Sequence, residues 1–190
     1  MRSAFLVHPG TENKPLSARD PAVGRSVLVL GLGNILLQDE GVGVRVVEQL
    51  QRQYRIVGAV EVLDGGTAGM SLLEHIRNRD HLIVVDAVST GQAPGTVITL
   101  SGEEVPAFFQ SRVSPHQMGL ADMLAALELM GEKPAEVTVI GVEPRDLDVG
   151  LELSDLVSTR VDELVMRLVG KLLSLGFEVD TVDQPRRGTA

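Results

Sequence analysis

The 190-residue chain has the composition of one ordinary globular domain, with 44% hydrophobic and 23% charged residues. A chain of this length can bury one sizeable core. Its formal charge of -9 and the lack of any basic run longer than Arg186-Arg187 argue against a nucleic-acid partner. The chain contains no cysteine, which excludes disulfides and thiolate chemistry. Any metal must therefore be bound by oxygen and imidazole ligands.

The first 25 residues are rich in proline, glycine and polar residues, and only Ala4 to Val7 is apolar. This segment lacks the apolar core of a signal peptide. No stretch of the chain approaches the roughly 18 apolar residues that a membrane helix requires. We therefore expect a cytoplasmic protein without membrane insertion, with a flexible extension over 1–25, a folded domain over 26–176 and a carboxyl-terminal tail over 177–190.

From residue 26 onward, short buried strands alternate with helices. This alternation predicts a single three-layer α/β/α sandwich with a twisted, mostly parallel sheet of about five strands. The direction of the fourth strand stays open. The predicted strands are 26–32, 60–63, 81–85, 96–100 and 137–142, and the predicted helices are 39–53, 68–77, 114–130 and 154–176.

The connection after the first strand carries the most distinctive residues. The glycines of 31–34 let the backbone turn where a side chain would clash, and Asp39 and Glu40 follow at the head of the next helix. The glycines resemble a dinucleotide fingerprint, but Leu36 stands in the place of its third glycine, and the two acids would repel a pyrophosphate. The chain also has no P-loop lysine and no G-x-S-x-G elbow.

One of the four histidines is placed to act at the carboxyl edge of the sheet, where ligands of such sheets bind. His8 lies in the extension, and His75 falls in the last turn of a helix, where solvation is the simpler explanation. His81 opens the strand that Asp86 closes, which puts the two roughly 16 Å apart. His116 begins its helix on the face that must meet the sheet, so its ring should overlook this edge.

Glu40, Asp86 and His116 reach this edge from three separate connections. Two carboxylates and one imidazole can hold a divalent ion and leave coordination positions open. Each residue also has an ordinary structural explanation: a helix dipole for Glu40, turn amides for Asp86, and a backbone hydrogen bond for His116. Spacing alone does not choose between Glu40 and its neighbour Asp39.

Several segments, taken together, resemble the hydrogenase maturation proteases. The agreement extends over roughly residues 26–175 and is specific because several motifs agree rather than one. The segments are GLGNILLQDEGVGVRVVEQL, VEVLDGGTAGMSLLEHIRNRDHLIVVDAV, APGT, EEVPAFF, SPHQMGLADMLAALELMG and VIGVEP.

The resemblance implies an endopeptidase that processes the precursor of the large subunit of a nickel-iron hydrogenase. Members of this family cut after a His or Arg in the carboxyl-terminal metal motif and free a short peptide. The three metal-contacting positions of the family fall on Glu40, Asp86 and His116. The implied metal is nickel, brought by the substrate, because two oxygens and one nitrogen should hold a resident ion only modestly.

Two versions of the mechanism are open. In one, the substrate's nickel acts as a Lewis acid on the scissile carbonyl or its attacking water. In the other, nickel only anchors the precursor and a carboxylate activates the water, as in an aspartyl protease, with Asp39 a candidate.

The competing hypotheses are a nucleotide- or cofactor-binding α/β module, a non-catalytic hydrogenase-assembly chaperone, and a protease of the spore germination type. The last lacks support from these motifs. The sequence leaves the oligomeric state open.

Overall fold

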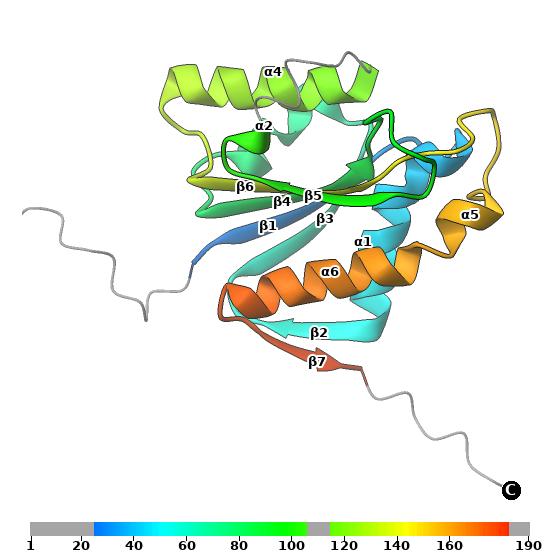
Figure 1. Ribbon diagram of the computed structural model, residues 1–190. Coiled ribbons are helices and arrows are strands. Elements are labelled where there is room, and N and C mark those ends of the chain that lie inside the picture. The colour runs from blue at the N-terminus through cyan, green and yellow to red at the C-terminus, as the bar shows by residue number, and fades with distance from the viewer. Residues whose placement is uncertain (1–24, 106–114, 183–190) are drawn as a thin grey trace, which may run out of the picture.

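The computed structural model describes residues 25–105 and 115–182, with the side chains of 115–119 excepted. Its centre is a five-stranded sheet with the spatial order β3-β1-β4-β6-β5 (Figure 1). The first four of these strands are mutually parallel, and β5 runs antiparallel to β6. The mostly parallel sheet expected from the sequence is therefore confirmed. The fourth predicted strand, whose direction the sequence left open, is the antiparallel β5. The strands are β1 Val27–Leu32, β3 Val60–Gly66, β4 His81–Ala87, β5 Val97–Ser101 and β6 Glu136–Val142.

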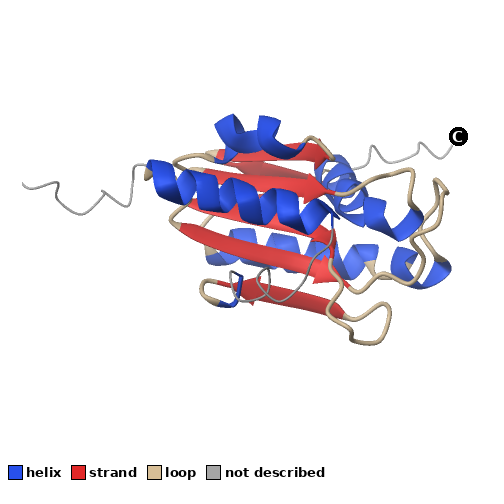
Figure 2. Cartoon of the chain, turned by 90° about the horizontal axis from the view of Figure 1, so that it is seen from above, coloured by secondary structure: helices blue, strands red, loops and turns tan. Residues whose placement is uncertain are grey.

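Helices cover both faces of the sheet, as a three-layer sandwich requires. Helices α1 and α6 lie on one face, and α2 and α4 lie on the other (Figures 1 and 2). Side chains of β1 alternate between the two cores: Val27 and Val29 pack with α1 and α6, whereas Leu28 and Leu30 face the α4 side. The helices are α1 Val42–Gln53, α2 Leu73–Ile76, α4 Pro115–Met130, α5 Asp155–Ser158 and α6 Val161–Ser174, with 3-10 turns η1 Gln38–Gly41 and η2 Gly69–Leu72.

Two predicted helices are shorter or divided. The segment expected as a helix over 68–77 is η2 followed by the single turn of α2, bounded by positive φ angles of 55° at Gly69 and 57° at Asn78. Ser154 does cap a helix, because its side chain accepts a hydrogen bond from the Val157 amide at 3.3 Å. That helix is only α5, and α6 begins separately at Val161.

Part of the carboxyl-terminal tail expected over 177–190 forms a strand. Residues Glu178–Thr181 form β7, which pairs antiparallel with β2, Tyr54–Val57, directly after α1. Phe177 and Val179 pack against the core that lies beneath α1 and α6. The partial burial of these side chains stabilises β7, because a strand of four residues would not be stable by itself. The amino-terminal extension, apart from Arg25, and residues 183–190 lie outside the described residues.

Helix α1 lies directly on the sheet because glycines occupy the contact. A Cβ atom added to Gly43 would lie 2.1 Å from the carbonyl oxygen of Val85 and 2.3 Å from that of Leu32. One added to Gly31 would lie 2.5 Å from the carbonyl oxygen of Gly43. The first turn of α1 is thereby pressed against the ends of β1 and β4.

We predict that Gly43→Ala lowers the free energy of unfolding by about 2–4 kcal/mol, because a side chain there must push the helix off the sheet. Gly170→Ala is the matched control, since Gly170 also lies in a helix and a Cβ there would meet nothing within 4 Å. This control should be neutral or stabilising by up to about 1 kcal/mol. Urea denaturation of both variants measures the difference, and equal stabilities would contradict the close packing.

Candidate functional site

Glu40 is placed by the glycine turn that follows β1. Gly33 has a φ of 125°, and a Cβ atom there would lie 1.7 Å from the carbonyl oxygen of Glu40. Only glycine allows the turn to fold back this closely on η1. The half-buried Glu40 therefore has a backbone position fixed at the carboxyl edge of β1, immediately before α1.

Asp86 occupies the end of the neighbouring strand β4 and is 5% exposed. The pKa of its carboxyl group is raised to about 8, mainly by burial and also by the negative charge of Glu40, against the lowering effect of one hydrogen bond from the Ala87 amide. Glu40 follows β1 and Asp86 lies at the end of β4, and these two strands pair in parallel, so both acids lie at the same carboxyl edge. The predicted arrival of Glu40 and Asp86 at one edge is confirmed, and their joint role as metal ligands stays a prediction.

His116 is the second residue of α4, and its side chain lies outside the described residues. The predicted helix face is confirmed further along, because Leu120, Leu124 and Leu127 are all buried against the sheet. Helix α4 leads into the start of β6 through residues 131–135, so its first turn points toward the carboxyl edge. The meeting of the His116 ring with the two carboxylates stays a prediction, and the described side chains alone contain no group of three metal ligands.

Asp39 has a different setting from Glu40, although the two are adjacent in sequence. Asp39 is fully buried, and its carboxylate accepts hydrogen bonds from the amides of Arg145 and Asp146, both at 2.9 Å. It also accepts bonds from the amide of Ser154 at 2.7 Å and from the Ser154 hydroxyl at 2.9 Å. Asp39 therefore ties the connection after β1 to the loop after β6.

Glu143 is an edge residue that the sequence reasoning did not single out as part of the site. It follows β6, is 8% exposed, and accepts 2.6 Å hydrogen bonds from the amide and the hydroxyl of Thr90. Longer bonds of 3.3 Å come from the amides of Gly91 and Gln92. Although burial acts to raise it, the pKa of Glu143 is lowered by these donors. The sequence did offer a signal for Glu143, because this carboxylate directly follows a buried strand, much as Asp86 lies at the end of one.

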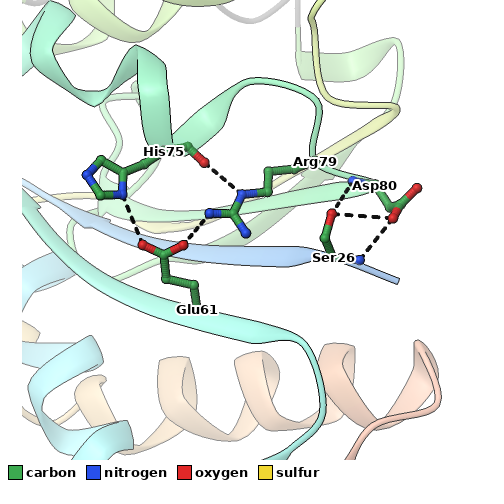
Figure 3. Close-up of polar contacts among 5 residues, drawn as sticks. All are labelled: Ser26, Glu61, His75, Arg79 and Asp80. Carbon is green, nitrogen blue, oxygen red and sulfur yellow. Dashed lines mark hydrogen bonds and ion pairs between the residues drawn. The ribbon is translucent and has the colours of Figure 1, made fainter. Parts of the chain in front are cut away.

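The other described histidines lie away from this edge. Figure 3 shows His75 directed toward Glu61, with Nδ1 and Oε1 3.0 Å apart, and Arg79 also pairs with that carboxylate. His81 is buried at the start of β4, where its Nε2 lies 2.9 Å from the Thr138 hydroxyl. Burial lowers the pKa of His81 to about 4, so its ring is neutral at pH 7. The predicted separation of His81 from Asp86 is confirmed by their places at the two ends of β4.

A cavity of about 560 Å³ lies between α4 and the β5–β6 edge. Its lining includes Val105, Leu124 and Val137. Since Val137 pairs with Leu82 near the start of β4, this cavity belongs to the amino half of the sheet. It is separate from the carboxylate pair.

The structure is an α/β sandwich that carries two acidic residues, Glu40 and Asp86, at the carboxyl ends of paired parallel strands. A family model described as hydrogenase maturation protease matches residues 44–171. The chain is 49% identical over 153 residues to the hydrogenase 2 maturation protease of Escherichia coli, covering 80% of this chain and 93% of the relative. The chain belongs to the hydrogenase maturation protease family and is a peptidase.

Solved structures agree with this assignment. The hydrogenase maturating endopeptidase HybD from E. coli superposes with a TM-score of 0.79 at 46% identity, covering 82% of this chain and 97% of that one. The [NiFe] hydrogenase maturation protease HybD from Thermococcus kodakarensis gives a TM-score of 0.64 at 31% identity, with coverage of 77% and 98%. The family membership replaces the nucleotide-binding, chaperone and spore-germination alternatives. In the described part of the chain, no helix has the length and apolarity to span a membrane.

We predict that Asp86→Asn gains stability over the parent protein as the pH rises. Folded Asp86 has a pKa of about 8 and keeps its proton up to that pH, whereas an aspartate in the unfolded chain has a pKa near 3.8. Across that interval the folded state binds more protons, so the parent's free energy of unfolding falls by at most about 1.4 kcal/mol per pH unit from this group. Asparagine removes this loss.

Chemical denaturation of both proteins between about pH 5 and about pH 9 measures the effect. This range spans the Asp86 pKa of about 8. The difference should widen up to about pH 8 and then level off. The depressed pKa of His81 has the opposite effect, weakening the fold as the pH falls from 6.5 through about 4. It is present in both proteins and cancels in the comparison, so a difference that stays constant with pH would contradict the buried proton on Asp86.

Proposed function

We propose that this peptidase removes a carboxyl-terminal peptide from the nickel-loaded precursor of a nickel-iron hydrogenase large subunit. In this proposal Glu40, Asp86 and His116 recognise the nickel that the precursor already carries. The observation that supports it most is the proximity of Glu40 to the buried Asp86, whose pKa both burial and that neighbour raise. A divalent cation would relieve the repulsion between two such carboxylates.

The donor set suits a metal that arrives with the substrate. Two carboxylates and one imidazole can share nickel with ligands of the precursor while leaving it positions to keep them. Because Asp86 favours its protonated form at neutral pH, nickel binding must displace a proton. A precursor without nickel offers nothing to replace the proton of Asp86, which would favour the loaded form.

The two versions of the mechanism place different demands on the carboxylates. If nickel polarises the scissile carbonyl or its water, Glu40 and Asp86 need only hold the ion. If nickel is an anchor, a carboxylate must accept a proton from water. Both oxygens of Asp39 already accept hydrogen bonds that join two loops, which argues against Asp39 in that second role.

We predict that Glu40→Gln, Asp86→Asn and His116→Gln each lower the rate of precursor cleavage by about 100-fold or more. Each substitution preserves size and removes one ligand. The measurement is mass spectrometry of nickel-loaded precursor after incubation with each variant. Full processing by all three variants would overturn the site assignment.

Matched controls come from the same residue types away from the edge. Glu74→Gln, His75→Gln and Asp180→Asn change exposed side chains of α2 and β7. We expect these three to cleave at the parental rate. A comparable loss in the controls would show that the site variants fail for reasons of stability.

We further predict that cleavage requires nickel on the precursor. Candidate large-subunit precursors, prepared with and without nickel, are incubated with the parent protein and analysed for loss of the carboxyl-terminal peptide. Only the loaded form should be shortened. Equal shortening of both forms would refute nickel recognition and leave the peptidase activity standing.

A further inference from the structure

Two loops beside Glu40 expose an unusual share of the apolar side chains. Of the twelve large hydrophobic residues exposed in the described chain, five lie on residues 35–36 and 147–151. Val149 is 87% exposed and Leu151 is 60% exposed. We call this set the apolar rim. Its members are Ile35, Leu36, Leu147, Val149 and Leu151.

The loops of the rim are joined by backbone hydrogen bonds. The Gly150 amide donates to the carbonyl of Leu36 at 2.9 Å, and the Gln38 amide donates to the carbonyl of Gly150 at 3.0 Å. A Cβ atom on Gly150 would lie 2.9 Å from the side chain of Gln38, so the two loops also contact each other through this side chain. The rim is therefore one surface made of two distant segments.

The rim is also tied to the carboxylate pair. The buried Asp39 binds the amides of Arg145 and Asp146, at the start of the second loop, and that of Ser154 at its end. The next residue after Asp39 is Glu40. The same short connection thus holds the apolar surface and one of the proposed nickel ligands, with no flexible segment between them.

We propose that the apolar rim docks an apolar segment of the large-subunit precursor and so presents its carboxyl-terminal region to Glu40. This rests on the proposed function above. Exposed side chains such as Val149 and Leu151 gain stability only when a partner covers them. The precursor is the partner indicated because the surface is continuous with the edge where it is to be cut.

Charges around the rim specify the partner segment further. Asp148 and Glu152 alternate with the apolar residues of the second loop, and Asp146 at its start pairs with Arg145 at 3.4 Å. An extended segment that carries apolar side chains flanked by lysine or arginine would match this pattern. A rim that binds side chains does not need the metal, so it should also contact a precursor that lacks nickel.

The test is the double variant Val149→Ser with Leu151→Ser. Binding of nickel-free large-subunit precursor to the immobilised protein gives a Kd that does not depend on cleavage. We expect the Kd of the variant to rise about tenfold or more over the parent. With nickel-loaded precursor, KM should rise similarly while kcat stays within about twofold, since the carboxylates are unchanged.

The matched control is Leu129→Ser with Met166→Ser, on α4 and α6, where the side chains are 91% and 60% exposed. This control should bind and cleave like the parent. Equal Kd values for parent, rim variant and control would overturn the docking proposal. Dissociation of a parental dimer in sedimentation velocity, caused by the rim variant alone, would instead show that a second copy covers the rim and would also overturn it.

The proposed function fails on a different result. If the parent protein leaves every nickel-loaded precursor uncut, the proposed reaction is wrong whatever the Kd values are. If the parent cuts the precursor and the rim variant binds and cuts it equally well, only the docking proposal is wrong.

Discussion

The buried carboxylate of Asp39 is the interaction on which the carboxyl edge depends. It has no exposed surface and accepts four hydrogen bonds from three residues more than a hundred positions further along the chain. Burying a charge is costly unless donors replace the lost water. These four hydrogen bonds offset that cost, so the Asp39 carboxylate links two connections of the chain. The connection after β1 carries the proposed ligand Glu40 and part of the exposed apolar surface, and the loop after β6 carries the rest of that surface.

The acids of this edge show how the number of donors decides the state of a carboxylate. Asp39 and Glu143 each accept several amide or hydroxyl hydrogen bonds. Asp86 accepts one, from the next residue, and faces the charge of Glu40. The two carboxylates with several donors hold loops in place, whereas Asp86, with one donor, has a raised pKa.

How far the sequence predicted this arrangement can be argued from single residues. Asp86 was found because a buried apolar strand ends on it, and Glu40 because it follows a glycine turn. Glu143 also follows a buried strand, yet its partners on residues 90–92 are visible only in the folded chain. The strand β7 was missed because its stability comes from pairing with β2 and from burial of Phe177, not from its own four residues.

The sequence by itself determined the alternation of strands and helices, the two-sided burial of β1, and the delivery of Glu40 and Asp86 to one edge. These follow from the period of hydrophobic residues and from the parallel order of the strands, which are local or topological properties. Only the tertiary structure separated Asp39 from Glu40. Adjacent side chains leave a turn in different directions, and which one meets the loop after β6 depends on packing between segments distant in the chain.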